Sequence, residues 1–170
     1  MKIRQGRLEG LHNRKLQIAN RKSTTAYIAL GANLGDRRAN IERALTLLRG
    51  TPSIRVTKIS TLLENPAIGG PADSPPFLNA VAEIETTLPP PDLLARLLDI
   101  EKSLGRQRRQ KWEARIIDLD LLLYGHAIVD DRDLQIPHPL MHTRRFVLDP
   151  LKEIAPDIMH PVLKRRIADL

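Results

Sequence analysis

Two aspartates in the segment RIIDLDLLLYG (residues 115–125) are the first residues that could do chemistry. The segment is otherwise typical of a buried strand, and Asp118 and Asp120 interrupt it. Side chains two apart on a strand share a face, which places these two Cβ atoms about 7 Å apart. Neighbouring carboxylates on an apolar strand repel each other and resist desolvation. A positive group must therefore compensate them, either a structural arginine or a metal ion.

The loop that precedes the aspartates is rich in cations, which are Arg106, Arg108, Arg109, Lys111 and Arg115. Carboxylates are hard oxygen ligands for Mg²⁺, which proteins hold through one or two carboxylates plus substrate phosphates. Arginines bind phosphate oxygens in bidentate fashion. Together these features favour an enzyme that cleaves a polyphosphate with the help of metal ions. The alternative is a solvated charge run with an Asp–Arg salt bridge.

The elements that must position these groups follow from the hydrophobic pattern. Helices are predicted at 35–50, where Asp36 can cap and Gly50 can stop the helix, and at 89–105, which opens with prolines. Strands are predicted at 26–32, 54–64, 77–86 and 115–125. This order indicates an α+β fold of the ferredoxin-like (split βαβ) type, a mostly antiparallel sheet with helices packed on one face. The last 45 residues add a short strand near 134–136 and C-terminal helical segments broken by Pro150 and Pro161.

The positive charge of the chain is concentrated at its beginning. The net charge is +7 over 170 residues, and residues 1–24 alone hold seven Lys or Arg against one acid. We interpret 1–24 as a basic, disordered extension and 25–170 as one domain. The absence of cysteine excludes disulfides and thiolate metal sites. No run approaches the roughly 20 apolar residues of a membrane span.

Several blocks of the sequence together resemble the 6-hydroxymethyl-7,8-dihydropterin pyrophosphokinase family of the folate pathway. They follow one another in the order and spacing of that family over about residues 25–170. The aspartate block combined with Ile-Pro-His-Pro is the most specific part of the resemblance. The blocks are YIALGANLGD (27–36), NPAIG (65–69), PPFLNAV (75–81), IEKSLGR (100–106), KWEARIIDLDLLLYG (111–125) and IPHPLMHTRRFVLDPLKEIAP (136–156).

The resemblance implies transfer of a diphosphate from ATP to the hydroxymethyl group of a reduced pterin, with release of AMP. It implies two Mg²⁺ ions on Asp118 and Asp120, so it favours a metal over a salt bridge. As catalytic residues it implies Arg106, Arg115, Asp118 and Asp120. The residues that it implies for ATP binding are Glu101, Arg106, Arg108, Lys111, Trp112, Arg115, Leu121, His138 and Arg144.

The pterin side has a physical rationale of its own. A pteridine is a flat aromatic ring whose edge alternates donors and acceptors, and an amide side chain can read both. By resemblance that side chain is Asn79, and Phe77, Phe146 and Trp112 can cover the ring faces. Ordinary core packing is the alternative for Phe77 and Phe146. The full set implied for the pterin is Asn65, Pro66, Ile68, Phe77, Asn79, Trp112 and Phe146.

Some positions depart from the usual pattern of the family. Glu113–Ala114 stands where Gly-Pro is common, and Asn65 stands where Thr is usual. These changes bear on loop stiffness and on substrate contacts, and they leave the aspartate pair untouched. We expect ATP and the pterin as substrates, no nucleic-acid or membrane partner, a cytoplasmic location, and a monomer rather than a dimer.

Two other classes of protein fit part of the pattern. The ferredoxin-like order also describes small RNA-binding domains, which stack bases on aromatic residues of the sheet. The near-neutral body of this chain and its acidic strand disfavour that class. A different two-metal nucleotidyl or phosphoryl transferase would use the same carboxylates on a different bond. The products formed from ATP distinguish such a transferase from a pterin pyrophosphokinase.

Overall fold

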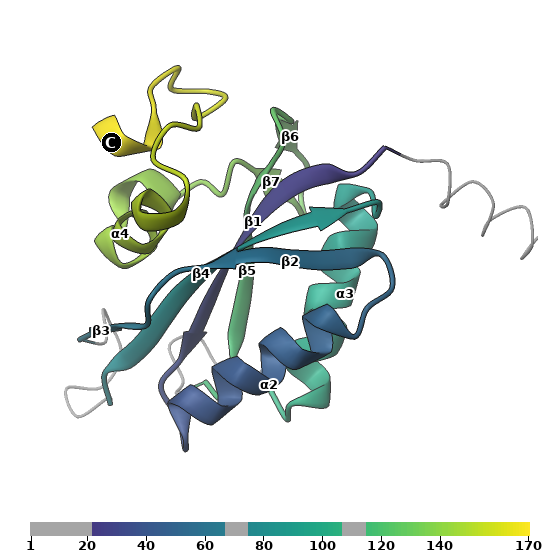
Figure 1. The fold of residues 1–170 in the computed structure, drawn as a ribbon, viewed down its shortest axis with the longest axis vertical. Helices are drawn as coiled ribbons and strands as arrows, with labels where there is room; N and C mark the ends of the chain where they lie inside the picture. Colours follow the sequence, from purple (N-terminus) through teal and green to yellow (C-terminus); the bar gives the residue numbers. More distant parts are fainter. Residues whose placement is uncertain (1–21, 67–74, 107–114) are drawn as a thin grey trace, which may run out of the picture.

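An antiparallel sheet forms the centre of the computed structural model, which describes residues 22–66, 75–106 and 115–170 (Figure 1). Its strands run in the order β2–β4–β1–β5, and β3 pairs with β4. A separate hairpin is formed by β6 (Val129–Asp130) and β7 (Gln135–Ile136). The sheet strands are β1 (Thr24–Ala32), β2 (Ile54–Ile59), β3 (Leu63–Asn65), β4 (Phe77–Thr86) and β5 (Asp118–Tyr124). The predicted ferredoxin-like order is confirmed.

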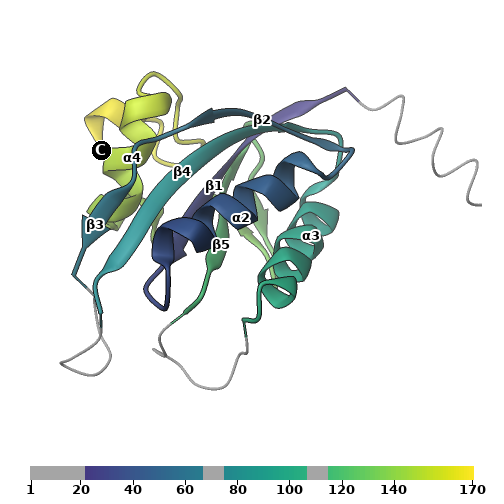
Figure 2. The same cartoon turned by 60° about the horizontal axis from the view of Figure 1, so that its bottom comes forward.

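Two helices, α2 (Arg37–Arg49) and α3 (Pro90–Ser103), cover one face of the sheet (Figure 2). The predicted cap is present, because the Asp36 side chain accepts a hydrogen bond from the backbone N–H of Ala39 at 3.0 Å. Each helix turns an apolar stripe toward the sheet. The stripes and the inward-facing strand residues form one core that includes Ile41, Leu48, Leu93, Leu97, Leu30, Leu119 and Leu121.

The opposite face of the sheet is covered by α4 (Arg145–Ile154) and the C-terminal segment, which includes the short 3-10 turns η1 (Met141–Thr143) and η2 (Ile167–Asp169). A second apolar cluster forms there from Tyr27, Val81, Leu122, Leu123, Val147 and Leu151, among others. Further along the same strands the residues become polar. This polar end of the face is where the candidate site lies.

Most predicted element ends lie within two residues of the observed ones, but the following predictions were wrong. The segment 54–64 is two strands, because the Ser60 hydroxyl accepts the Val81 N–H at 2.9 Å in place of a backbone carbonyl and interrupts the ladder. Strand β5 begins at Asp118, three residues later than predicted. Pro150 lies inside α4 and does not break it. A proline removes one helical N–H donor, and the Pro150 ring is buried with Val147 and Leu151 of the same helix.

Strand β1 begins at Thr24, one residue before the expected start of the domain, and residues 1–21 lie outside the described part of the chain. None of the helices in the described ranges is long and apolar enough to cross a membrane.

Candidate active site

A single row across the sheet brings the key residues together. Gly31 in the central strand β1 stands opposite Asn79 of β4 on one side and opposite Asp118 of β5 on the other. Two residues back along β1, Ala29 pairs with Asp120 in the same way. Residues directly opposite one another point to the same face. Asn79, Asp118 and Asp120 therefore share the face that carries α4, at its polar end.

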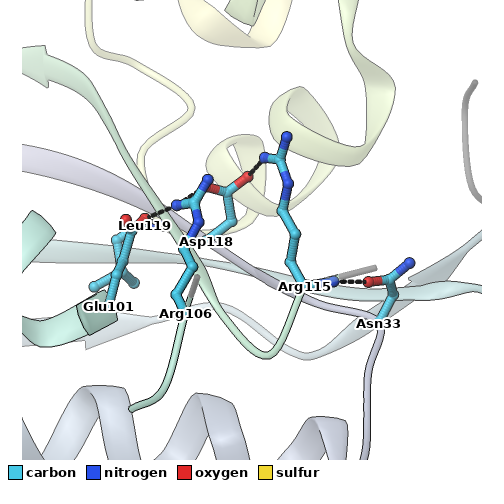
Figure 3. Close-up of polar contacts among 6 residues, drawn as sticks. All are labelled: Asn33, Glu101, Arg106, Arg115, Asp118 and Leu119. Carbon is cyan, nitrogen blue, oxygen red and sulfur yellow. Dashed lines mark hydrogen bonds and ion pairs between the residues drawn. The ribbon is translucent and has the colours of Figure 1, made fainter. Parts of the chain in front are cut away.

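Asp118 lies between two arginines (Figure 3). The Nη1 atom of Arg106 donates to one carboxylate oxygen of Asp118 at 2.6 Å, and Nη1 of Arg115 donates to the other. The side chain of Asp118 is 17% exposed, so water screens these ion pairs only in part. Among the described residues, the positive groups that pair with Asp118 are these two arginines. Both arginines come from the cation-rich segment that the sequence places before the aspartates.

Glu101 is a second carboxylate partner of Arg106. It lies on α3, is 2% exposed, and accepts the backbone N–H of Leu119 in β5 at 2.7 Å. The guanidinium of Arg106 also donates to it. The carboxylate thus ties α3, Arg106 and the aspartate strand together.

Arg106 and Arg115 donate to Asp118 and not to Asp120. Within the described part of the chain it accepts no hydrogen bond from a protein group. Burial raises the pKa of Asp120, and the charge of Asp118 raises it further, to about 6. The charges of Arg106, Arg144 and Arg115 act in the opposite direction and compensate only in part. An added cation would stabilise the ionised form of Asp120.

The two aspartate carboxylates on this face fit Mg²⁺. Asp118 and Asp120 offer hard oxygens side by side, which is the chemistry that this ion prefers. Among the residues described, no group of three or more His, Cys, Asp or Glu side chains could hold a metal alone. Such a sparse set suits an ion that takes its other ligands from substrate phosphates and water.

Asn33 fixes the main chain beside this row, and sequence reasoning missed it. It is 3% exposed, and its Oδ1 accepts the backbone N–H of Arg115 at 2.6 Å (Figure 3). Its own N–H donates to the carbonyl of Arg115 at 3.0 Å, and its Nδ2 donates to the carbonyl of Pro75 at 3.3 Å. A polar amide directly after the predicted strand 26–32 was the available signal.

Asn79 carries an unused hydrogen-bond donor. The residue is 7% exposed, and its Nδ2 is buried without a hydrogen-bond partner among the described residues. Leaving a buried donor unpaired costs about 1–3 kcal/mol. The ring of Phe77, two residues earlier on β4, lies on the same face. A ligand acceptor at this point would satisfy the amide and lie beside an aromatic ring.

The first turn of α4 and the segment before it supply further predicted residues. The Arg144 guanidinium lies over the Phe146 ring, with Cζ 5.7 Å from the centroid. Phe146 also packs against the α4 apolar cluster, so core packing accounts for part of its surface. Burial lowers the pKa of His138, and the positive charge of Arg144 lowers it further. The Nδ1 atom of His138 accepts the Leu140 N–H at 3.2 Å.

The remaining predicted residues fall into three groups. Asn65 ends β3 opposite Phe77, and Pro66 beside it is exposed. The Leu121 side chain is buried in the core under α2 and α3, on the opposite face, so only its main chain can meet a ligand on the aspartate face. The predicted site residues that lie outside the described ranges are Ile68, Arg108, Lys111 and Trp112.

Comparisons with a family model and with individual proteins agree on one family. Residues 27–156 match the model of the family 7,8-dihydro-6-hydroxymethylpterin-pyrophosphokinase (HPPK). The chain is 43% identical over 135 residues to the 2-amino-4-hydroxy-6-hydroxymethyldihydropteridine pyrophosphokinase of Pseudomonas aeruginosa, covering 79% of this chain and 83% of that protein. It is 45% identical over 136 residues to the Methylorubrum extorquens protein of the same name, covering 80% and 85%.

The fold is also that of a solved structure, the wild-type Plasmodium falciparum HPPK-DHPS with pteroate. The TM-score is 0.68 at 14% identity, over 88% of this chain and 44% of that chain. At that identity the likeness concerns the fold alone.

Proposed function

This chain belongs to the 7,8-dihydro-6-hydroxymethylpterin-pyrophosphokinase family, and from that premise we propose that it transfers diphosphate from ATP to 6-hydroxymethyl-7,8-dihydropterin in folate biosynthesis. One observation of the structure supports this most strongly. The unused amide donor of Asn79 and the carboxylate of Asp118 lie in one row across the sheet, on either side of Gly31. The amide proposed to bind the pterin therefore lies next to the carboxylate proposed to bind metal and phosphate.

The pterin is recognised at Asn79. The buried Nδ2 donates to an acceptor on the pterin edge, which removes the cost of an unpaired donor. Phe77 and Phe146 lie against the faces of the ring, as aromatic side chains do with flat heterocycles. A site built to hydrogen-bond a substrate edge rejects analogues that lack the matching group, because its own polar atoms are then left unpaired.

Asp118 and Asp120 hold magnesium, in the form of two ions. Magnesium bound there would supply positive charge for the polyphosphate oxygens. Asp120 is suited to this role because it accepts no hydrogen bond within the described residues and its pKa is raised by burial. Asp118 is suited because it lies beside Asp120 on the same face.

Arg106 and Arg115 orient the triphosphate. Both guanidinium groups already lie at Asp118, so a triphosphate placed there meets two cations that can bind phosphate oxygens. Glu101 keeps Arg106 at the site, and Asn33 fixes the main chain of Arg115. The pterin hydroxyl oxygen attacks the β-phosphorus and releases its proton to solvent. The bond from that phosphorus to the bridging oxygen of the α-phosphate breaks, and AMP leaves with that oxygen.

Product analysis tests the proposal. Purified protein incubated with ATP, Mg²⁺ and 6-hydroxymethyl-7,8-dihydropterin should yield AMP and diphosphorylated pterin in equal amounts. Release of pyrophosphate would support the alternative two-metal nucleotidyl transferase, and release of ADP would indicate transfer of one phosphoryl group. Either outcome would contradict the proposal. A cytoplasmic location and a monomeric state stay predictions from the sequence.

A further inference from the structure

Gly31 is a glycine that the backbone does not require. The left-handed glycines of the described chain are Gly35, Gly105 and Gly125, whereas Gly31 has an ordinary strand conformation. An L-residue could adopt that conformation without strain. A glycine inside a strand also weakens it, because it has no side chain to pack. The reason for a glycine here must therefore be space.

The space above Gly31 is taken by the Asn79 amide. A Cβ atom at position 31 would lie 3.0 Å from Oδ1 of Asn79 and 3.7 Å from Cδ1 of Phe77. The first distance is shorter than an ordinary van der Waals contact, so Asn79 would have to move. The amide oxygen thus rests over the bare backbone of Gly31, and the nitrogen end is the part without a hydrogen-bond partner among the described residues.

We propose that Gly31 is a positioning residue for pterin recognition: its missing side chain lets the Asn79 amide lie over β1 with its donor available to the ligand. This rests on the proposed function, since it assumes that the pterin binds at Asn79. Gly31 also separates Asn79 from Asp118 across the sheet. A side chain there would stand between the pterin-reading group and the phosphate-handling group.

The variant Gly31→Ala tests the proposal, with Gly50→Ala as a matched control. Gly50 ends α2 at φ −74°, and a Cβ there would lie 3.4 Å from the Thr46 carbonyl, so the same methyl group is added away from the site. The first measurement is the affinity for 6-hydroxymethyl-7,8-dihydropterin with Mg²⁺ and a non-hydrolysable ATP analogue. Gly31→Ala should weaken it by about 10- to 100-fold, the effect of a small misplacement of a recognition group. Affinity for the ATP analogue alone should stay within about twofold of wild type, because the atoms within 4 Å of the added methyl group belong to Asn79 and Phe77 in the described structure. Gly50→Ala should leave both affinities unchanged.

A double-mutant cycle with Asn79→Ala separates positioning from other roles. If Gly31 acts through the amide, Gly31→Ala should weaken pterin binding by no more than about twofold in the Asn79→Ala background. An equal loss in both backgrounds, or wild-type pterin affinity in the single variant, would overturn the proposal.

The same two variants keep the test decisive if Gly31→Ala folds poorly. If Gly31→Ala alone has a low melting temperature, removing the amide in the double variant should restore it, since the clash is with Asn79. A double variant that stays unstable would overturn the proposal. Failure of the proposed function looks different, because the wild-type protein itself would then not bind the pterin or form AMP.

Discussion

At the scale of single residues, the two aspartates that look equivalent in the sequence have different surroundings. Asp118 accepts hydrogen bonds from Arg106 and Arg115, whereas Asp120 accepts none within the described part of the chain. The sequence could predict that both share a face, because strand periodicity is local. It could not predict which carboxylate the arginines would take, because that depends on how α3 and the residues before β5 approach the sheet. The two residues should therefore respond differently to substitution.

Substitution of Asp120 should stabilise the metal-free protein in a pH-dependent manner. The folded-state pKa of about 6 lies above the ordinary value of 3.8, so the favourable contribution of the protonated group is complete below 3.8 and is lost as the pH rises through 6. Asp120→Asn should raise the free energy of unfolding by about 1–3 kcal/mol at about pH 7.5 and change it little at about pH 4.5. Denaturant unfolding in a chelator measures this. An Asp120→Asn variant less stable than wild type at the higher pH would contradict it.

Substitution of Asp118 should have the opposite effect on stability. Asp118→Asn removes the carboxylate that Arg106 and Arg115 share among the described residues, in a partly buried site. We expect the free energy of unfolding at neutral pH to fall by about 1–3 kcal/mol. Both variants should lose Mg²⁺-dependent turnover. If Asp118→Asn proves as stable as Asp120→Asn, the ion pairs at Asp118 contribute nothing to the fold.

At the scale of elements, strand register is what assembles the site. The sequence predicted β1, β4, α2 and α3 well, because their apolar periodicity and end signals are local. It did not predict the interruption at Ser60 or the contacts of Asn33, because both arise from side-chain hydrogen bonds to distant backbone groups. Nor could it place Asn79 opposite Gly31, since the register of paired strands is not written in either strand alone.

Asn33 should be important for both stability and activity. Asn33→Ala removes the acceptor of the Arg115 N–H and the donor to the Pro75 carbonyl, which should lower the free energy of unfolding by about 1–3 kcal/mol. It should also lower kcat/KM, because the main chain at Arg115 is no longer fixed. Asn40→Ala is the matched control, since within the described residues that buried amide side chain donates to the Leu34 carbonyl alone, at 3.0 Å. Equal kinetic effects in the two variants would show that Asn33 acts through general stability.

At the scale of the whole molecule, the net positive charge is concentrated in residues 1–24. Residues 1–24 account for nearly all of the net charge of +7, yet the paired part of the sheet begins at Thr24, opposite Thr86. The fold class could be predicted because the order of strands and helices permits few compact topologies. The role of the basic segment could not be predicted, because it carries no apolar periodicity that would specify a contact.

Deletion of residues 1–23 should therefore preserve both the melting temperature and the kinetics. Deletion of 1–27 is the contrasting variant, because it removes the part of β1 that pairs with Thr86, Ile84 and Tyr124. That longer deletion should lower the melting temperature strongly. A loss of pterin affinity after the shorter deletion would show that the basic segment takes part in binding.

The most direct test of the central claim is a crystal structure of the protein with Mg²⁺, a non-hydrolysable ATP analogue and 6-hydroxymethyl-7,8-dihydropterin. The central claim is that one row of the sheet joins pterin recognition to phosphate handling. We predict the pterin edge hydrogen-bonded to the amide of Asn79 over Gly31, with Mg²⁺ bound by both Asp118 and Asp120. A pterin bound away from Asn79, or metal ions held by phosphate with neither aspartate in contact, would contradict the claim.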